Sequence, residues 1–313
     1  GRIGGLFRAY QNIKNFIKKN KLKLLIFIDF PDFNLSLARV ARAAGVPVLY
    51  YISPQVWAWR YSRVRKIAGR IDKMAVIFPF EVPIYQGVGL DVEFVGHPLL
   101  DVLTLNREED ASFKHSQFSG DPLVALLPGS REREIQSLLP EMLGAADIIA
   151  KQKPGAKFIL PAAPGVKVQE LNKFLRPHSI PIAVVERQTY GAIIAADMVI
   201  VASGTATLET AILGKPMVIV YKVSPVSYWV GKAMVKVNWI GLPNIVAGKK
   251  VVPELLQEEA RSERIAEEAL RILNDEAYRK EMVVALAEVR KKLGAPGAVE
   301  RVARMALEMI STP

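Results

Sequence analysis

The strongest structural signal in the sequence is the stretch Met198-Val199-Ile200-Val201-Ala202-Ser203-Gly204-Thr205-Ala206-Thr207-Leu208-Glu209. Its apolar, β-branched start predicts a buried strand over 198–201, and the residues after its small turn predict a helix over 206–213. Free N–H groups and the dipole at such a helix start favour phosphate. We therefore predict that Ser203, Gly204 and Thr205 bind phosphate and that Glu209 accepts hydrogen bonds from ribose hydroxyls. The alternative is an ordinary helix cap at Ser203 or Thr205, with Glu209 on the surface.

The same alternation of short apolar runs and helical patterns extends in both directions from this stretch. Expected strands cover 24–28, 48–52, 73–77, 92–95, 123–127, 158–160, 183–185, 198–201 and 217–221. Expected helices cover 35–44, 61–68, 81–86, 132–152, 167–175, 190–195, 206–213, 226–235 and most of the chain after 261, with a break at 294–297. This pattern predicts an α/β fold of two doubly wound, Rossmann-like domains that face a central cleft.

A polar stretch over 99–121 interrupts the pattern and marks the expected domain boundary. We expect a first domain over 1–118 and a second over 119–313, whose last helix is a candidate to pack back on the first. Ligands of such sheets bind at the carboxyl ends of the strands.

The composition and the distribution of charge exclude several classes of protein and point to one kind of partner. The chain has 313 residues, 50% of them apolar, no cysteine and a formal net charge of +11. A disordered chain, a disulfide framework, thiolate catalysis and cysteine-bound zinc are excluded. Residues 1–23 carry seven basic residues and no acid, and residues 57–73 carry six basic residues against Asp72 alone. This regional charge predicts an anionic partner, such as a membrane surface, nucleic acid or a phosphorylated substrate.

The N-terminal segment reads as a basic amphipathic helix. Leu6, Tyr10, Ile13 and Ile17 recur at helical spacing among the basic residues, with Phe7 and Phe16 beside them. Such a helix suits an anionic membrane surface, and its alternative is a helix that packs on the core. No apolar run is long enough to span a bilayer, and the N-terminal segment itself does not have the pattern expected of a signal peptide. The chain lacks an initiator Met, so we expect it to be truncated at its N-terminus.

Nucleophile elbows, zinc-protease motifs and Walker loops are absent from the sequence, and the three histidines are scattered. We therefore expect no metal site. A second turn after a strand, Leu127-Pro128-Gly129-Ser130-Arg131, precedes a helix. Its arginine is suited to hold a diphosphate bidentately. The alternative is a surface pair between Arg131 and Glu132 or Glu134.

A third loop, Ile28-Asp29-Phe30-Pro31-Asp32-Phe33-Asn34, places two carboxylates around a proline directly after a strand. We predict that Asp29 is a general base whose pKa is raised by apolar surroundings. Asp32 or Asn34 is expected to cap a helix that begins at Leu35. A metal-binding pair of carboxylates is the weaker alternative.

Two further segments end strands of the first domain. The loop Ser53-Pro54-Gln55-Val56-Trp57-Ala58-Trp59-Arg60 either lines an acceptor site or packs one tryptophan under a helix. In Gly96-His97-Pro98, the histidine is expected to face the cleft, with a purely structural role as the alternative.

At these loops the chain resembles the lipid-A-disaccharide synthase family, membrane-associated glycosyltransferases of the GT-B type. The resemblance rests on motifs in family order: the segments 28–34 and 53–60, Phe78-Pro79-Phe80-Glu81, Val95-Gly96-His97, Leu126–Arg131, Ala202–Ala206, Leu208-Glu209 and Leu242-Pro243-Asn244-Ile245-Val246-Ala247-Gly248. It covers nearly the whole chain. The loop at 53–59 is specific to the family, whereas the Ser-Gly-Thr turn occurs in other sugar-nucleotide enzymes.

The resemblance implies transfer of 2,3-diacylglucosamine from UDP to the 6-hydroxyl of 2,3-diacylglucosamine 1-phosphate, with inversion and without a metal or cofactor. Asp29 matches the family's essential aspartate and Arg131 its essential arginine, while Ser203, Gly204, Thr205, Glu209 and Asn244 match its nucleotide-binding segments. The family implies a cytoplasmic enzyme on the inner face of the inner membrane. It also implies that a strand, a turn and a helix of the first domain lie upstream of Gly1.

Two other functions are compatible with some of the same residues. A UDP-sugar epimerase shares the two-domain architecture but explains neither the tryptophan loop nor the basic helix. A nucleic-acid-binding module would use the basic segment 60–73 with Trp57, Trp59 and Tyr61 as stacking groups. Because these aromatic residues end a strand beside the expected cleft, we expect no nucleic-acid partner.

Overall fold

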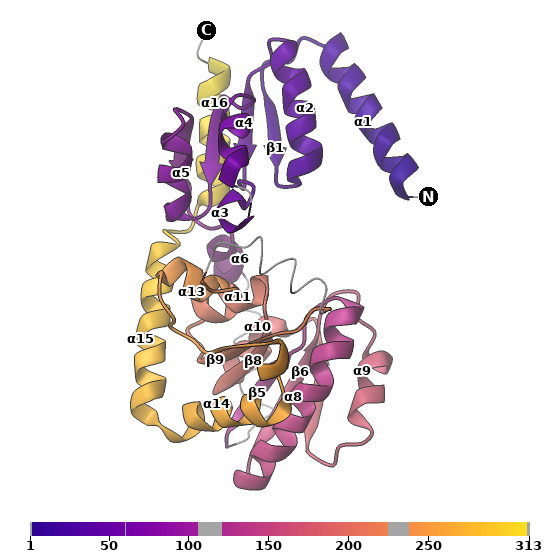
Figure 1. Cartoon of the computed structure of the whole chain (residues 1–313), viewed down its shortest axis with the longest axis vertical. Coiled ribbons are helices and arrows are strands. Elements are labelled where there is room, and N and C mark those ends of the chain that lie inside the picture. The colour runs from indigo at the N-terminus through magenta and orange to yellow at the C-terminus, as the bar shows by residue number, and fades with distance from the viewer. Residues whose placement is uncertain (1, 60, 106–120, 225–237, 312–313) are drawn as a thin grey trace. The chain divides into compact units, whose positions relative to one another are not determined.

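The computed structural model describes residues 2–59, 61–105, 121–224 and 238–311 (Figure 1). The chain forms two compact units, and the division falls within helix α6 (Leu99–Leu105). Unit 1 contains the residues up to Asp101 together with the C-terminal segment from Leu293, and unit 2 contains most of the chain between them. The last helix therefore belongs to unit 1, although it follows unit 2 in the sequence.

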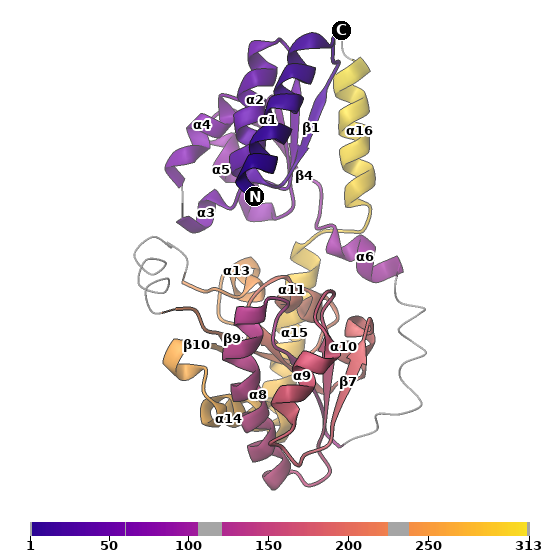
Figure 2. The same cartoon turned by 90° about the vertical axis from the view of Figure 1, so that its right-hand side faces the viewer.

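Unit 1 is built on a four-stranded parallel sheet in the order β1-β2-β3-β4. Its strands are β1 (Leu25–Ile28), β2 (Val48–Tyr51), β3 (Lys73–Val76) and β4 (Asp91–Phe94). Its helices are α1 (Arg2–Lys19), α2 (Pro31–Ala43), α3 (Val56–Trp59), η1 (Tyr61–Arg63), α4 (Val64–Ala68), η2 (Pro79–Glu81), α5 (Val82–Gln86) and α16 (Ala298–Ser311). Figure 2 shows α2 and α4 on one face of this sheet and α16 on the other.

Helix α1 packs on α2 with one face only. Ile17 is buried and the ring of Tyr10 meets Phe33 edge-on, with 6.0 Å between the centroids. Leu6, Phe7, Ile13 and Phe16 remain exposed. The helix therefore packs on the core through part of its surface, as the alternative interpretation expected, and still presents apolar side chains to solvent. Docking to a membrane surface stays a prediction.

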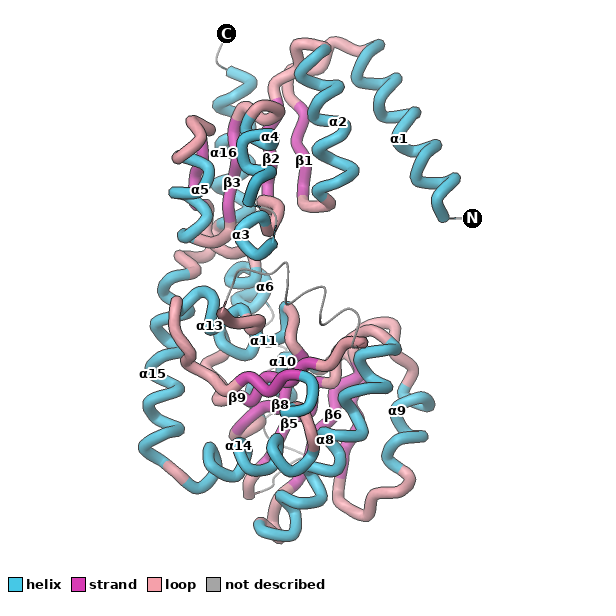
Figure 3. Tube along the Cα trace, viewed as in Figure 1, coloured by secondary structure: helices cyan, strands magenta, loops and turns pink. Residues whose placement is uncertain are grey.

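Unit 2 is built on a six-stranded parallel sheet in the order β10-β9-β8-β5-β6-β7. Strands β9, β8, β5 and β6 of this sheet are labelled in Figure 3. Its strands are β5 (Leu123–Leu127), β6 (Lys157–Ala162), β7 (Ile182–Glu186), β8 (Met198–Ala202), β9 (Met217–Tyr221) and β10 (Glu254–Leu256). Its helices are α8 (Glu132–Gln152), α9 (Val168–Leu175), α10 (Thr189–Ala195), α11 (Thr205–Ile212), α13 (Leu242–Ala247), η4 (Gln257–Glu259), α14 (Ser262–Asn274) and α15 (Glu276–Lys292).

The order of this sheet is that of a dinucleotide-binding Rossmann fold. When the strands are counted from β5, the order across the sheet reads 6-5-4-1-2-3, and its direction of growth reverses between β5 and β8. The two parallel sheets confirm the predicted fold class of two Rossmann-like α/β units.

The differences from the sequence predictions are local. Strand β10 was not predicted, and α2 begins at Pro31 instead of Leu35. The expected helix over 226–235 lies outside the described residues, as does the side chain of Trp59. Among the helices described, none is both long and apolar enough to cross a bilayer.

Candidate functional site

The reversal point of the unit 2 sheet brings together two of the predicted loops. Strand β5 leads into the loop that carries Arg131, and its neighbour β8 leads into Ser203 and Gly204. The two strands pair in parallel with Leu127 opposite Val201, so both loops leave the same edge of the sheet side by side. Ligands of open α/β sheets bind at this position. These two loops therefore form the candidate ligand site of unit 2.

The turn at Gly204 leaves the start of α11 open to a ligand. Gly204 is the N-cap, with φ 156° and ψ −162°, a conformation that only glycine adopts readily. No side chain caps the helix, and the Thr207 hydroxyl donates to the Gly204 carbonyl at 2.7 Å. The alternative of a side-chain cap at Ser203 or Thr205 is therefore wrong. Such uncapped N-terminal amides are donors for an anion.

Glu209 lies one turn into α11 and is half-buried. Its carboxylate accepts a hydrogen bond from the Tyr190 hydroxyl of α10 at 3.0 Å. Burial raises the pKa of Glu209, and the bond from Tyr190 offsets part of that increase. The alternative of a solvated surface glutamate is contradicted by this environment. The bond from Tyr190 therefore holds the carboxylate in place.

Arg131 is the N-cap of α8 and its side chain is 82% exposed. Its guanidinium forms an ion pair with Glu134 at 2.7 Å. Gly129 has a positive φ of 103°, and a Cβ there would lie 2.5 Å from the Glu134 carboxylate. Arg131 is thus in the surface pair named as its alternative. An exposed pair of this kind contributes little stability. Little free energy is therefore lost if the guanidinium leaves Glu134 to bind an anionic ligand.

Asn244 of α13 is completely buried and uses its whole side chain within unit 2. Its amide nitrogen donates to the Val252 carbonyl at 3.0 Å and to Glu254 at 2.6 Å. Its oxygen accepts from the N–H groups of Val251 at 2.6 Å and Val252 at 3.0 Å. These four bonds exhaust the capacity of an amide side chain. Asn244 is therefore engaged with the protein itself.

The partner carboxylate, Glu254 on β10, was not predicted. It also accepts the N–H groups of Ile240 at 2.9 Å and Gly241 at 3.0 Å, just before α13. Asn244 and Glu254 together fix the chain on both sides of α13. No local pattern in the sequence indicated this role, because the partners of Glu254 lie 10 to 14 residues away.

Asp29 follows β1 at the carboxyl edge of the unit 1 sheet. Asp29 and Phe30 have positive φ values of 49° and 47°, and Ile52 after the neighbouring β2 has 64°. Three non-glycine residues in this conformation on adjacent strand ends store strain of the kind found at functional sites. The Asp29 carbonyl accepts from the Tyr50 hydroxyl at 2.6 Å and from the Asn34 amide at 2.7 Å. The backbone of this turn is thus firmly held.

Two expectations for this loop are wrong. The Asp29 side chain is exposed, and is not enclosed by apolar neighbours. Asp32 and Asn34 do not cap α2, because the helix begins at Pro31 with Phe30 as the N-cap. Asp32 instead accepts a bond from Arg63 at 2.8 Å, and Asn34 supports the Asp29 turn. The left-handed Phe30 allows the helix to start immediately after the strand.

A buried carboxylate lies at the same edge of unit 1 and was not predicted. Glu81 is fully buried and accepts hydrogen bonds from the Ser53 hydroxyl at 2.5 Å, the Trp57 indole at 3.1 Å and the Phe78 N–H at 3.1 Å. Burial raises the pKa of Glu81 to about 7, while these donors lower it in part. Glu81 therefore ties the tryptophan loop to the end of β3.

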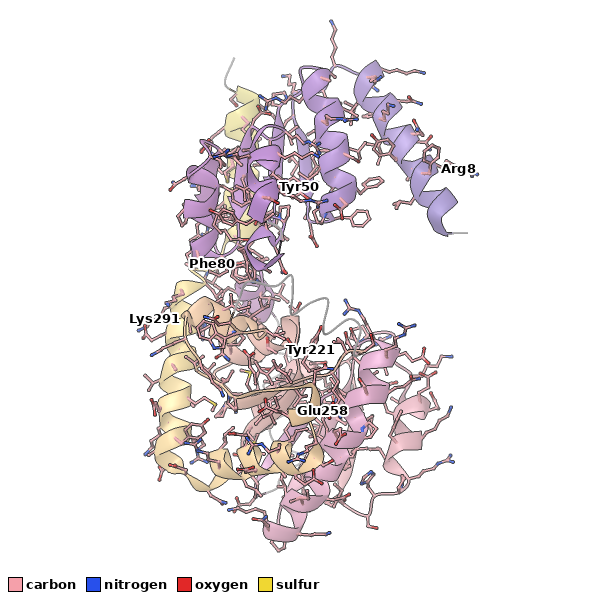
Figure 4. The ribbon with its side chains drawn as sticks, in the orientation of Figure 1. Arg8, Tyr50, Phe80, Tyr221, Glu258 and Lys291 are labelled. Carbon is pink, nitrogen blue, oxygen red and sulfur yellow. The ribbon has the colours of Figure 1, made fainter. Side chains whose placement is uncertain are left out.

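Aromatic rings enclose this carboxylate. Trp57 meets Phe80 edge-on at 5.2 Å, and Phe80, labelled in Figure 4, stacks on Phe78 at 5.3 Å. His97 packs on Phe78 at 5.2 Å and is buried, and burial lowers its pKa to about 4. The structure supports the structural interpretation of His97. Trp57 is half-buried in the cluster, which matches the packing alternative for that loop.

No metal centre is evident in the parts of the chain that the structure describes. Those residues contain no group of three or more His, Cys, Asp or Glu side chains placed to hold a metal ion.

Sequence comparisons connect these loops to one family. The family model described as lipid-A-disaccharide synthetase matches residues 1–308. A lipid-A-disaccharide synthase of Geobacter sulfurreducens is 47% identical over 313 residues, which is 98% of this chain and 80% of that protein. The synthase of Syntrophus aciditrophicus is 47% identical over 311 residues, 99% of this chain and 81% of that protein.

Structural comparisons show the fold alone, because their sequence identities are low. A structure described as a putative UDP-N-acetylglucosamine 2-epimerase from Listeria monocytogenes matches with a TM-score of 0.66 and 14% identity, over 98% of this chain and 79% of that one. A UDP-GlcNAc 2-epimerase from Neisseria meningitidis bound to UDP-GlcNAc matches with a TM-score of 0.66 and 12% identity, over 97% and 81%.

These neighbours share the two-unit GT-B architecture, but they do not support the epimerase alternative over the transferase. The family match extends over almost the entire chain and the identities of the synthases lie far above those of the epimerases. The chain therefore belongs to the lipid-A-disaccharide synthase family of glycosyltransferases.

Proposed function

We propose that this chain transfers 2,3-diacylglucosamine from UDP to the 6-hydroxyl of 2,3-diacylglucosamine 1-phosphate. The products are UDP and a β-1,6-linked, tetra-acylated disaccharide 1-phosphate. The observation that carries the proposal is the pair of loops at the reversal point of the unit 2 sheet, in a chain of this family. Unit 2 would hold the donor, unit 1 would hold the acceptor, and no nucleic acid takes part.

The donor side follows from the open helix start in unit 2. The amide of Ser203 is already bonded to the Val220 carbonyl at 3.0 Å, so the Ser203 hydroxyl, the amides of Gly204 and Thr205 and the helix dipole would bind the diphosphate. Glu209 would accept hydrogen bonds from the ribose hydroxyls. Arg131 would leave its exposed pair with Glu134 and neutralise the charge that develops on the departing UDP. Asn244 would contribute by keeping the segments around α13 in place.

The acceptor side relies on Asp29. The carboxylate would accept the proton of the attacking 6-hydroxyl while the oxygen forms the new bond to the anomeric carbon. The bond from that carbon to the diphosphate breaks on the opposite face, which inverts the configuration. The strained and hydrogen-bonded turn would aim the carboxylate, and its exposure leaves it accessible to a sugar.

Replacement of Asp29 by Asn tests this assignment. The amide keeps the size of the side chain but cannot accept the proton, so turnover should fall by about 10²-fold or more. UDP affinity should remain that of the wild type, because the nucleotide residues lie in unit 2. Near-normal kcat in Asp29→Asn would remove Asp29 from the mechanism. The control variant Asp91→Asn makes the same change at an exposed carboxylate of β4 and should retain most of the turnover.

The proposed chemistry uses protein amides and Arg131 for the leaving group and requires no metal or other cofactor. Full activity in EDTA is the expected result, and a requirement for an added divalent cation would contradict it.

The proposed location is the cytoplasmic face of the inner membrane. Helix α1 presents exposed Leu6, Phe7, Ile13 and Phe16 together with basic residues and has no acidic residue in its first turn. Exposed apolar side chains with surrounding cations are suited to the surface of an anionic bilayer, where the lipid substrates reside.

A further inference from the structure

A basic pocket of about 170 Å³ lies within unit 1, between the first turns of α2 and the segment 63–70. Arg63, Lys66 and Arg70 line it, and Asp32 is the one acid among its described lining residues. Leu35 and Ile67 also line it, and both are buried. The pocket therefore combines an apolar base with a surplus of positive charge.

Two of the three cations are held in place by the protein. Arg63 pairs with Asp32 at 2.8 Å, which neutralises the one carboxylate among the described lining residues. Arg70 donates from Nη1 to the Leu35 carbonyl at 3.0 Å. A guanidinium has five N–H donors, so each of these bonds leaves others for a ligand. Lys66 is exposed and forms no ion pair with any described residue. The guanidinium groups of Arg63 and Arg70 are held in position, and the ammonium group of Lys66 has no ion-pair partner among the described residues. This set of donors suits a phosphate.

The pocket is adjacent in the chain to the proposed base. Asp29 is followed after one residue by α2, and the pocket is lined by Asp32, Leu35 and Ser36 from the first two turns of that helix. A sugar that presents a hydroxyl to Asp29 and carries an anion elsewhere on its ring would need cations close to this helix start. The lining of the pocket supplies them.

We propose that this pocket binds the anomeric phosphate of the acceptor sugar. The proposal rests on the proposed function and specifies how unit 1 recognises its substrate. A phosphomonoester carries a charge of about −1.5 to −2 at pH 7, which complements three cations and one paired carboxylate. A membrane phosphodiester carries a single charge, and α1 already offers an exposed apolar face for the bilayer. The charge balance thus favours the phosphomonoester.

The test compares two acceptors, 2,3-diacylglucosamine 1-phosphate and the same sugar without its phosphate. The variant is Lys66→Glu, an exposed position where folding is not at risk. We expect kcat/KM for the phosphorylated acceptor to fall about tenfold, the loss typical of one charge-assisted hydrogen bond. The value for the unphosphorylated acceptor should remain that of the wild type. Equal losses for both acceptors would overturn the proposal.

The matched control is Arg65→Glu, which makes the same charge change on the same helix outside the pocket. Its kcat/KM should equal that of the wild type with both acceptors. A loss equal to that of Lys66→Glu would show that the net charge of the helix, and not the pocket, is responsible, and would overturn the proposal. Arg70→Lys, which keeps the charge but loses the fork, should give an intermediate loss confined to the phosphorylated acceptor.

Two further experiments are needed. The first distinguishes the phosphate of the acceptor sugar from that of membrane lipid, and the second distinguishes failure of the pocket proposal from failure of the proposed function. Sedimentation with phosphatidylcholine vesicles that contain phosphatidylglycerol should be equal for the wild type and Lys66→Glu; a loss there with unchanged acceptor preference would assign the pocket to membrane lipid and overturn the proposal. If the wild type transfers sugar to neither acceptor, the proposed function fails. Calorimetry with glucosamine 1-phosphate then tests the pocket: binding weakened by Lys66→Glu supports it, and absence of wild-type binding overturns it.

Discussion

Asn244, which was predicted to belong to the nucleotide site, makes four side-chain hydrogen bonds within the protein itself. Replacement by Ala would leave the N–H groups of Val251 and Val252 and the Glu254 carboxylate without their partner in a buried position. We predict that the unfolding free energy falls by about 3 kcal/mol in Asn244→Ala, measured by urea denaturation. The exposed Asn172→Ala on α9 is the control and should change it little. An equally small change in Asn244→Ala would contradict the role.

Glu81 makes the stability of unit 1 depend on pH. The folded state keeps the proton up to a pKa of about 7, whereas an ordinary glutamate releases it near 4.5. Between these values the folded state binds more protons, so the unfolding free energy falls as the pH rises, by up to about 3 kcal/mol. His97 acts in the opposite direction, because its pKa of about 4 lies below the ordinary 6.5 and its contribution is lost as the pH falls.

Glu81→Gln should remove this dependence of the unfolding free energy on pH, because Gln has no ionisable carboxyl group. The unfolding free energy of the variant minus that of the wild type should therefore be higher at pH 8 than at pH 5, since Gln carries no charge to bury. Denaturation at both pH values measures the difference. Glu93→Gln, an exposed position on β4, should give the same difference at both. If the Glu81→Gln difference is also independent of pH, the buried carboxylate does not titrate in this range.

At the scale of an element, the start of α11 depends on the backbone of Gly204. An added Cβ would meet no atom within 4 Å, so the cost of Gly204→Ala lies in its φ of 156° and not in a collision. We predict that the strained loop shifts its amides and raises the KM for the UDP-sugar about tenfold, measured by steady-state kinetics. Gly165→Ala provides the control, because Gly165 also has a positive φ and open space but precedes α9. An unchanged KM in Gly204→Ala would separate this turn from nucleotide binding.

The elements that were predictable from the sequence are those with local signals. Long apolar runs such as 123–127 and 217–221 gave strands with correct bounds, because both faces of a central parallel strand are buried. Strand β10 was missed because it has three residues and begins with an acid. The start of α2 was missed because the left-handed Phe30 has no sequence signature.

The parts of the candidate site that could be predicted from the sequence are the loops that directly follow strands. The loops at Asp29, Arg131 and Ser203 were placed correctly at the carboxyl edges of the two sheets. The cluster around Glu81 was not predicted, because Ser53 and Trp57 lie 28 and 24 residues away and become partners only through the order of the strands.

At the scale of the whole molecule, α1 is expected to place the enzyme on the bilayer. Replacing Lys14, Lys18 and Lys19 by Glu should lower sedimentation with anionic vesicles at low salt at least about tenfold, since each cation near the surface contributes about 1 kcal/mol. The same reversal at the exposed Lys151, Lys167 and Lys173 of unit 2 is the control and should have little effect. Unchanged sedimentation of the α1 variant would exclude docking through this helix.

The identity of the reaction product tests the central claim most directly. The chain is incubated with UDP-2,3-diacylglucosamine and 2,3-diacylglucosamine 1-phosphate, and the products are resolved by mass spectrometry and NMR. The transferase account predicts UDP in equal amount to a β-1,6-linked, tetra-acylated disaccharide 1-phosphate. An epimerised UDP-sugar without any disaccharide would contradict it.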